Sequence, residues 1–489
     1  MRTWKFARLS NSAFDSRIKS SEVKRSEQWL GYFLGPALVA NLYACVSGSY
    51  LNSFYTDVLH LNSLAAGAFL TLMPIISKVI DAITNIIMGL IVDNTHSKQG
   101  KARPWILVSG PLMLISGILL FTVPRSNAAI QAVWVTCTYN LYFSVSYTIY
   151  NLSNVITLPL STRDGKKRDS LAMAQSMGIN MVPGAILAVV FPSFILPYMG
   201  VNQSRWITVM AVVAVLGFLG TLIQYYFTKE RITEEHAQTT ETASVDIRAQ
   251  IKGCLSSKYW VIIVVVIFMH KLTECIQVNA MLYYANWVVG TYNDGVTLSL
   301  LNILGQSLLG PGVLIIWPCV KKLGKQKVYI IFGIIAVIGG LTGLFVGKSL
   351  TPALVALTIR SIGLLPMTYV TLSLLSDALD HVEWKCGYRC DGFSSAIYSI
   401  IITVTAGLGL GCLNLGLSQT GYVPPLSDGS WVAQSAGVQN FLTFCVFGVP
   451  AIAMAVMVVL FFKFDLEKKL PEIHKQIRAR NGEMNKSEE

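Results

Sequence analysis

The chain has 489 residues, of which 53% are hydrophobic and only 13% are charged, with a net charge of +12. A soluble protein of this length would carry about a quarter charged residues, so the composition excludes a soluble enzyme, a disordered chain and a secreted disulfide scaffold. A helix that crosses the hydrocarbon core needs about 20 apolar residues, which leaves room for about a dozen spans and their connectors. The sequence therefore predicts a multi-pass protein of the cell membrane.

Apolar runs predict an all-α membrane protein with 12 transmembrane helices. In chain order they lie at residues 29–55, 63–92, 104–123, 129–160, 170–199, 206–228, 258–290, 296–319, 327–347, 351–378, 392–418 and 436–463. The first run follows a long basic and polar leader and leads into another span, so we expect no cleaved signal peptide.

The positive charge is concentrated in alternate connectors. One set of connectors contains Lys98, Lys101, Arg103, Arg163, Lys166, Lys167, Arg168, Lys321, Lys322, Lys325, Lys327, Lys385 and Arg389. The other set contains only Arg125, Arg205 and Lys348. Short loops that carry lysine and arginine stay on the cytoplasmic side, so both termini are predicted to be cytoplasmic. The charge thus indicates topology and not binding to nucleic acid.

The predicted spans form two groups of six. Residues 229–257 are the only long polar connector in the middle of the chain. We therefore expect a leader at 1–28, a six-helix bundle at 29–228, a cytoplasmic linker at 229–257, a second bundle at 258–463 and a cytoplasmic tail at 464–489. The connectors after the second and eighth spans are both short and basic and contain a glycine, as a tight turn requires. Repeated halves of this kind are typical of secondary transporters.

Polar residues lie along one face of several spans. In the second span Ser77, Lys78, Asp81, Asn85 and Gly89 recur at helical spacing. The first span has such a face through Asn41, Cys45 and Asn52, and the fourth has one through Asn140, Ser144, Tyr147, Asn151 and Asn154. Small polar residues also join neighbouring helices, so this structural role stays open for them. An ion pair in mid-span is costly to keep without a use, which favours a functional role for Lys78 and Asp81.

The seventh span has a second charged group in His270, Lys271 and Glu274. Glu274 can reach either of the other two along the helix, so the group is either a self-satisfied structural cluster or a protonatable site. Arg360, in the tenth predicted span, could extend to the membrane surface. Phosphate-loop, serine-elbow and zinc-pair motifs do not occur. We therefore expect no enzyme, no ATP-driven pump, and no cofactor or bound metal.

Three segments resemble one known family. Residues 77–105 (SKVIDAITNIIMGLIVDNTHSKQGKARPW), 373–392 (SLLSDALDHVEWKCGYRCDG) and the tail FKFDLEKKLPEIHKQIRAR resemble the glycoside–pentoside–hexuronide:cation symporters, the group that contains the melibiose permease. FYTDV at 54–58 and the connector STRDGKKRDSL add to this match. The resemblance implies the major facilitator fold and a sugar-type solute moved with Na⁺, H⁺ or Li⁺. It also implies a conformational role for the matched motif residues Gly89, Asp93, Arg103, Asp377, Asp380, Lys385 and Arg389.

The chain departs from the family at several acidic positions. The first acid of the second span is kept as Asp81, but the second, where coupling cations bind in the family, is Asn85. The acids of the fourth and first spans fall on Asn151 and Asn41, and the basic residues of the fifth and eleventh spans fall on Ser176 and Thr403. An amide has no charge and cannot release a proton. Asp81 alone, or Glu274 with His270, could still bind and release H⁺.

Two functional hypotheses follow from these residues. The favoured one is a symporter that moves a small glycoside-like solute with a cation, H⁺ in preference to Na⁺, by alternating access. The charge would come from Lys78 and Asp81, and hydrogen bonds to the solute from Asn41, Tyr147, Asn151 and Thr403. The second is an uncoupled facilitator, or a carrier of a more amphipathic solute. A sensor without flux is a third possibility, and the lipid bilayer, the solute and the cation are the only partners that we expect.

Overall fold

A computed structural model gives the structure of the protein. It describes residues 4–5, 15–20, 22–46, 49–61, 64, 67–93, 95–97, 99–162, 164–231, 247–306, 312–388, 390–426 and 430–487. The chain divides into two compact units. Unit 1 contains Met1–Glu241 and Tyr422–Ala433, and unit 2 contains Thr242–Gly421 and Gln434–Glu489.

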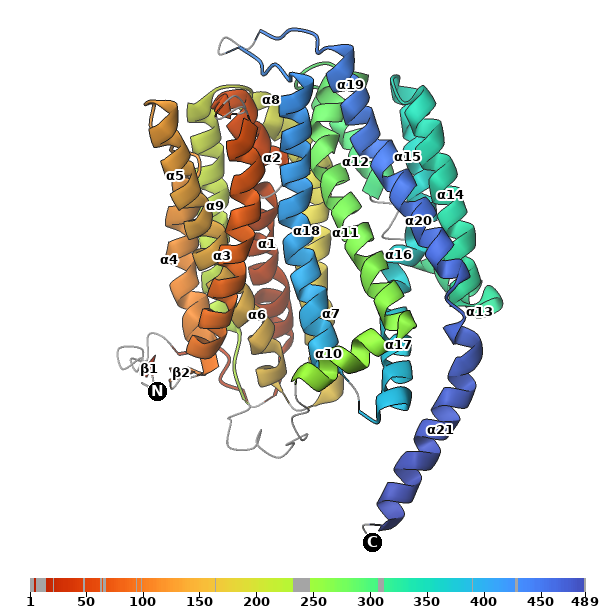
Figure 1. Cartoon of the computed structure of the whole chain (residues 1–489). Helices are drawn as coiled ribbons and strands as arrows, with labels where there is room; N and C mark the ends of the chain where they lie inside the picture. Colours follow the sequence, from red (N-terminus) through yellow and green to blue (C-terminus); the bar gives the residue numbers. More distant parts are fainter. Residues whose placement is uncertain are drawn as a thin grey trace. The chain divides into compact units, whose positions relative to one another are not determined.

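Unit 1 is built from long helices, several of which include a π-helical segment (Figure 1). In chain order these are η3 (Glu27–Leu34), α1 (Gly35–Val46), α2 (Ser49–Ser53), η4 (Phe54–Val58), α3 (Ala68–Asp93), α4 (Arg103–Leu119), α5 (Ala128–Asn140), η6 (Leu141–Tyr147), α6 (Thr148–Ser161), α7 (Gly165–Ala185), η7 (Ile186–Ile195), α8 (Leu196–Met199) and α9 (Gln203–Phe227). Asp164 and Asn202 cap the first turns of α7 and α9, where their side chains accept bonds from backbone N–H groups.

Unit 2 contains the remaining helices. They are α10 (Ile247–Ser256), α11 (Lys258–Tyr284), η9 (Ala285–Val289), α12 (Gly295–Gln306), α13 (Val313–Leu323), α14 (Lys325–Val346), α15 (Leu350–Gly363), α16 (Leu365–Tyr369), α17 (Thr371–Cys386), α18 (Asp391–Thr420), α19 (Ala436–Thr443), η11 (Phe444–Gly448), α20 (Val449–Phe462) and α21 (Leu466–Ser487). Within this unit α10 is a short helix that packs against α17, as Figure 1 shows.

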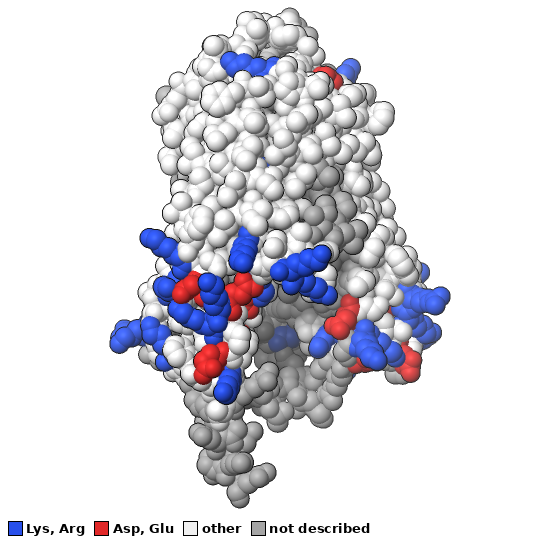
Figure 2. All heavy atoms as spheres, turned by 90° about the vertical axis from the view of Figure 1, so that its right-hand side faces the viewer, with Lys and Arg blue, Asp and Glu red and all other residues white. Residues whose placement is uncertain are grey.

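Many of the described helices are apolar enough to cross a membrane. Among the described residues, 8 helical segments have the length and composition of a span, and Arg103–Leu119, Gly295–Gly305 and Leu350–Gly363 are shorter apolar helices. Figure 2 shows one face of the molecule, on which a wide band almost free of lysine, arginine, aspartate and glutamate separates charged side chains at its two ends. In the part of the chain that the structure describes, the only strands are β1 (Trp4–Lys5) and β2 (Thr95–His96), which pair in parallel. The expected all-helical architecture is thus confirmed in outline.

Glycines bring the core helices of unit 1 into close contact. A Cβ on Gly217 of α9 would lie 2.6 Å from the side chain of Leu42 of α1, and a Cβ on Gly35 would meet Gln224 at 2.7 Å. Small residues allow helix backbones to approach closely, and this supports packing where lipid removes much of the hydrophobic drive. The α1, α4 and α9 helices form the resulting core of unit 1.

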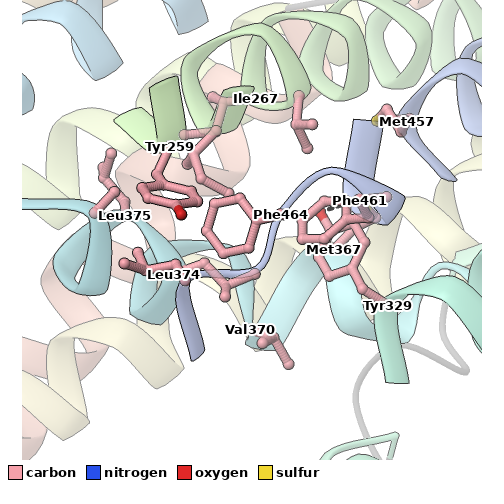
Figure 3. Packing of buried hydrophobic residues seen from close by; sticks show 14 of the residues in the cluster. Tyr259, Ile267, Tyr329, Met367, Val370, Leu374, Leu375, Met457, Phe461 and Phe464 are labelled. Carbon is pink, nitrogen blue, oxygen red and sulfur yellow. Dashed lines mark hydrogen bonds between the residues drawn. The ribbon is translucent and has the colours of Figure 1, made fainter. Parts of the chain in front are cut away.

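Aromatic side chains fill the core of unit 2 near the start of α21. Tyr329 of α14 stacks on Phe461 of α20 with ring centroids 3.8 Å apart, and Tyr259 of α11 meets Phe464 edge-on at 5.4 Å (Figure 3). All four rings are buried. This cluster fixes the ends of three long helices relative to one another and provides a rigid base for the charged residues described below.

Candidate functional site

An ion pair lies in the middle of α3 in unit 1. The ammonium of Lys78 is 2.7 Å from Oδ2 of Asp81, one helical turn away. The other oxygen of Asp81 accepts a short hydrogen bond from the hydroxyl of Ser144 on η6, and Ser144 also lies 3.2 Å from Oδ1 of Asn140. The pair therefore faces a neighbouring helix of its own unit. The polar faces predicted for the second and fourth spans meet at this point.

An aromatic ring lies beside the ammonium, and two further rings pack near it. Nζ of Lys78 lies 5.5 Å from the ring centroid of Phe143, a favourable position for a cation. Next to Phe143, the ring of Tyr43 stacks on Tyr147 with centroids 4.0 Å apart. Tyr147 is a predicted solute-binding residue. Tyr43 was not predicted, although it lies on the same turn of the first span as Asn41.

The remaining predicted residues of unit 1 have different surroundings. Asn41 is buried, and Cys45 lies 4.0 Å from its side-chain oxygen. Asn85 donates to the backbone carbonyl of Asp81 and not to its carboxylate. Asn151 is exposed on α6. The next polar residue of that face, Asn154, is buried in a network with Gln175 and Gln224, so its role is to join helices.

Unit 2 contains a pocket beside the charged residues of α11. The pocket has a cavity volume of about 60 Å³ and is lined by His270, Thr273, Glu274, Gln277, Val278, Gly305, Leu364, Thr368, Pro450 and Met457. Glu274 pairs with Lys271 at 2.7 Å and not with His270. Thr403 of α18, the predicted solute ligand of this unit, directs its hydroxyl to the carbonyl of Ser399.

The expectation that Arg360 extends to the membrane surface is wrong. Its side chain is 1% exposed near the end of α15, where Nη1 donates to the carbonyl of Val446 at 3.2 Å. Among the described residues, Nε and Nη2 have no hydrogen-bond partner. The glycine opposite explains the burial, because a Cβ on Gly339 of α14 would collide with the backbone of Arg360. The two helices are too close for the side chain to leave.

The basic connector between α3 and α4 is bonded to an acid that lies more than 120 residues later in the chain. Glu230, which follows α9, accepts hydrogen bonds from the backbone N–H groups of Lys101, Ala102 and Arg103 at 2.7–3.0 Å. A carboxylate is favourable at the start of a helix such as α4. Burial raises the pKa of Glu230, and the three N–H groups partly offset this effect.

Arg103, a residue of the matched motif, is buried at the same place. Its Nη2 donates to the carbonyl of Tyr225 at 2.8 Å, and its Nη1 donates to the carbonyl of Gln99 at 3.0 Å. Gly89 has open space around the position of a Cβ, and Asp93 ends α3. The side chain of Asp93 lies outside the described residues.

Unit 2 repeats the arrangement of Glu230. Glu467, which follows α20, accepts from the backbone N–H groups of Lys325 and Gln326 at 2.9 and 3.1 Å, where α14 begins. The glycine before each capped helix has a positive φ, +108° at Gly100 and +83° at Gly324. Neither glutamate was predicted as a cap, because each lies more than 120 residues from the helix that it caps.

The predicted motif residues of unit 2 make three different polar contacts. Asp377 pairs with Lys325 at 2.6 Å, and Asp380 lies 2.9 Å from His474 of α21. Lys385 donates to the carbonyl of Ser256 and so connects α17 to α10. Arg389 lies outside the described residues.

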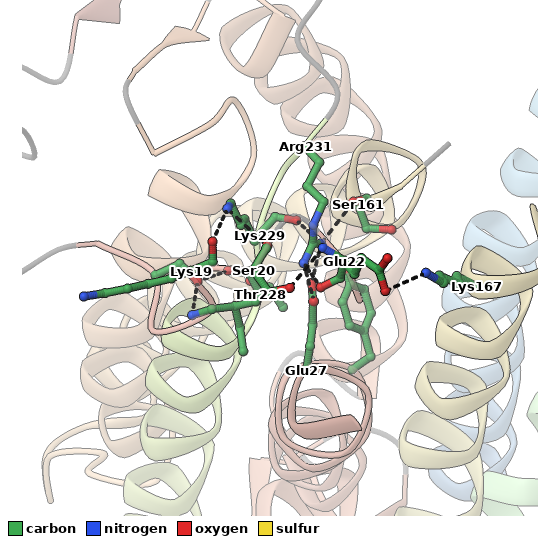
Figure 4. Close-up of polar contacts among 12 residues, drawn as sticks. Lys19, Ser20, Glu22, Glu27, Ser161, Lys167, Thr228, Lys229 and Arg231 are labelled. Atoms are coloured by element: carbon green, nitrogen blue, oxygen red, sulfur yellow. Dashed lines mark hydrogen bonds and ion pairs between the residues drawn. The ribbon is translucent and has the colours of Figure 1, made fainter. Parts of the chain in front are cut away.

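Two further polar clusters of unit 1 were not predicted. Glu27, which is fully buried, forms a two-pronged ion pair with Arg231 at 2.7 and 2.9 Å (Figure 4). At the far end of the first span, the buried carboxylate of Asp57 accepts bonds from Ser53, Thr56 and Tyr422 at 2.7–2.9 Å. The two acids lie just outside the ends of the first predicted span, and one partner of each, Arg231 for Glu27 and Tyr422 for Asp57, lies more than 200 residues away in the chain.

Long apolar helices that carry paired charges are typical of a multi-pass membrane transporter. The chain belongs to the family described as MFS/sugar transport protein, whose model matches residues 32–468. This result confirms the resemblance seen in the sequence, and the protein is a transporter of the cell membrane and not an enzyme.

Similar proteins support this assignment. The isoprimeverose transporter of Lactiplantibacillus pentosus is 27% identical over 447 residues, which are 88% of this chain and 87% of that protein. The inner membrane symporter YicJ of Escherichia coli (strain K12) is 26% identical, over 90% of this chain and 92% of that protein. Among solved structures, a D-xylose-proton symporter matches with a TM-score of 0.60 at 14% identity, over 91% of this chain and 98% of that chain. The last match shows a shared fold alone.

Proposed function

We propose that the protein carries a small sugar-type solute across the membrane together with H⁺, by alternating access. The observation that carries this proposal is the family match over residues 32–468. The names of the relatives support it, because they include an isoprimeverose transporter and a symporter. The proposal includes 12 spans with both termini in the cytoplasm. The concentration of lysine and arginine in alternate connectors supports this topology.

Polar and aromatic residues of unit 1 supply the proposed solute contacts. Stacking against a flat sugar face needs an accessible aromatic ring, and the half-buried Tyr43–Tyr147 stack beside Lys78 is the proposed platform in unit 1. Asn41 and Asn151 of the same unit provide amide groups that match sugar hydroxyls. None of these groups carries a charge, which favours a neutral solute over a hexuronide.

The proposed coupling group is Glu274 with His270. Both side chains line the pocket of unit 2, so water can deliver and remove a proton there. Asp81 is the weaker candidate because its two oxygens are already used by Lys78 and Ser144. Proton transfer through Asp81 would have to break an ion pair that the apolar surroundings strengthen.

The test is uptake into proteoliposomes that contain the purified protein. A counterflow screen over pentosides, hexosides and hexuronides identifies the solute, and an inward H⁺ gradient should then drive its accumulation. We expect Glu274→Gln to abolish accumulation against a gradient and to leave counterflow within about twofold of wild type, because a neutral amide cannot release a proton. Lys271→Gln, which removes the partner of Glu274 but keeps the carboxyl group, is the matched control. Unchanged accumulation by Glu274→Gln would reject this role.

An uncoupled facilitator is the second candidate. The ion pair of Lys78 with Asp81 favours it, because the charge of α3 is balanced without any transported ion. In that case net flux would stay the same after both the Na⁺ and the H⁺ gradients have been collapsed. The same screen, extended to amphipathic solutes, would then reveal a carrier of a different substrate class.

A further inference from the structure

The carboxylate of Asp81 lies in a cluster of oxygen atoms that a metal cation could use. The cluster contains the two oxygens of Asp81, the hydroxyl of Ser144 and the side-chain oxygen of Asn140, which lies 3.2 Å from that hydroxyl. Carboxylate, hydroxyl and amide oxygens are the ligands that hard cations prefer. The exposed fraction of the Asp81 side chain is 10%, so its negative charge requires a nearby positive charge.

Lys78 supplies that positive charge from within the protein. Its ammonium is 2.7 Å from Asp81, its side chain is 16% exposed, and the ring of Phe143 lies 5.5 Å away. An ammonium placed against both a carboxylate and an aromatic face is held more firmly than a surface lysine. The amide of Asn85 is uncharged and so adds no second negative charge on this face of α3, and its nitrogen donates to the backbone carbonyl of Asp81.

We propose that Lys78 is a built-in cation that occupies the position of a metal ion at Asp81 and thereby prevents Na⁺ and Li⁺ from binding there. A metal ion that entered the cluster would lie within a few ångströms of the ammonium. Two positive charges this close repel each other strongly where the surroundings have a low dielectric constant. One carboxylate cannot balance both charges. Lys78 is therefore the residue that decides which ions this site accepts.

The experiment removes the ammonium and measures metal binding in the full-length protein. The thermal unfolding midpoint of detergent-solubilised protein is compared in NaCl, LiCl and choline chloride at equal ionic strength. For wild type we expect the same unfolding midpoint in all three salts, because no metal ion binds at Asp81. In Lys78→Gln, NaCl or LiCl should raise the midpoint by about 2 °C or more over choline chloride, because the freed carboxylate now binds the metal ion.

Three further variants separate a metal site from a general structural effect. Lys78→Arg keeps the positive charge and should show no difference between the salts. Lys78→Gln combined with Asp81→Asn removes the carboxylate as well and should lose the metal effect. Lys271→Gln breaks an ion pair of the same 2.7 Å length and spacing. Among the described residues no serine of a neighbouring helix bonds to Glu274, so we expect no metal effect there.

Two results would overturn the proposal. One is stabilisation of wild type by Na⁺ or Li⁺ that Lys78→Gln abolishes. The other is the absence of any metal effect in a folded Lys78→Gln protein. If Lys78→Gln is unfolded in choline chloride, recovery of the fold in NaCl supports the proposal, and failure to recover while the double variant folds contradicts it. The proposal concerns the ion choice of the transporter proposed above, but the measurement needs neither solute nor gradient. Its failure can therefore be distinguished from a failure of coupled transport.

Discussion

The cost of a buried charge depends on how many partners the charged group has, and two arginines of this protein illustrate the range. Arg103 donates to the carbonyls of Gln99 and Tyr225 and lies 4.7 Å from the ring of Tyr225. Arg360 donates to a single carbonyl, that of Val446. A buried ion that is poorly satisfied can be replaced by an apolar side chain at little cost, whereas the removal of a well-bonded one leaves its partners unsatisfied.

We expect Arg360→Met to raise the free energy of unfolding by about 1 kcal/mol. Methionine fills a similar volume and adapts to an irregular space between helices. Arg103→Met, the control, should lower the free energy by about 3 kcal/mol because two carbonyls lose their donors. Chemical denaturation of the detergent-solubilised protein measures both values. A destabilised Arg360→Met protein would show that the guanidinium has a binding partner and would contradict the interpretation of Arg360 as an unsatisfied charge.

At the scale of elements, the turn before a helix and the acid that caps it act together. Gly100 precedes α4 and Gly324 precedes α14, both with a positive φ that other residues avoid. A Cβ at Gly100 would overlap the carboxylate of Glu230, and a Cβ at Gly324 would lie 2.8 Å from Oε1 of Glu467. Each glycine is therefore required by its backbone conformation and by the space that the capping acid needs.

Alanine substitutions separate these two requirements. Gly421 also has a positive φ, +76°, but nothing lies within 4 Å of its Cβ position. We expect Gly421→Ala to lower the free energy of unfolding by about 1 kcal/mol through backbone strain alone. Gly100→Ala and Gly324→Ala should each cost about 2–3 kcal/mol because the acid is displaced as well. Equal losses in all three variants, measured by thermal unfolding, would show that the acids move aside without cost.

The sequence predicted some of these elements and not others, for a physical reason. Helical periodicity placed Lys78 and Asp81 on one face of α3, and short basic connectors with a glycine predicted tight turns before α4 and α14. Such features depend on residues within a few turns of each other. The hydrogen bond from Ser144 to Asp81, the cap by Glu230 and the burial of Arg360 depend on contacts between segments 63–127 residues apart or on the spacing of helices. Composition and periodicity carry no information about such contacts.

At the scale of the whole molecule, the two units repeat the same capping arrangement. In each unit an acid after one long helix caps another, Glu230 with α4 in unit 1 and Glu467 with α14 in unit 2. A mid-chain linker and similar basic connectors indicated two halves in the sequence. The two units share a structural feature, a helix whose N-terminus is capped by a distant glutamate. Each cap lies entirely within its own unit, so each should stabilise that unit independently of the other.

Independent caps should contribute additively to stability. We expect Glu230→Gln and Glu467→Gln each to lower the free energy of unfolding by about 1–2 kcal/mol, because an uncharged amide interacts less with the positive end of a helix. The double variant should lose the sum of the two values within about 0.5 kcal/mol, as distant sites without shared partners do. Denaturation of wild type, both single variants and the double variant forms a complete thermodynamic cycle. A deviation of more than about 1 kcal/mol from the sum would show that the caps are coupled, as would occur if the two units changed conformation together. The same four proteins, assayed for counterflow, should keep the solute specificity of wild type because neither cap belongs to the proposed solute contacts.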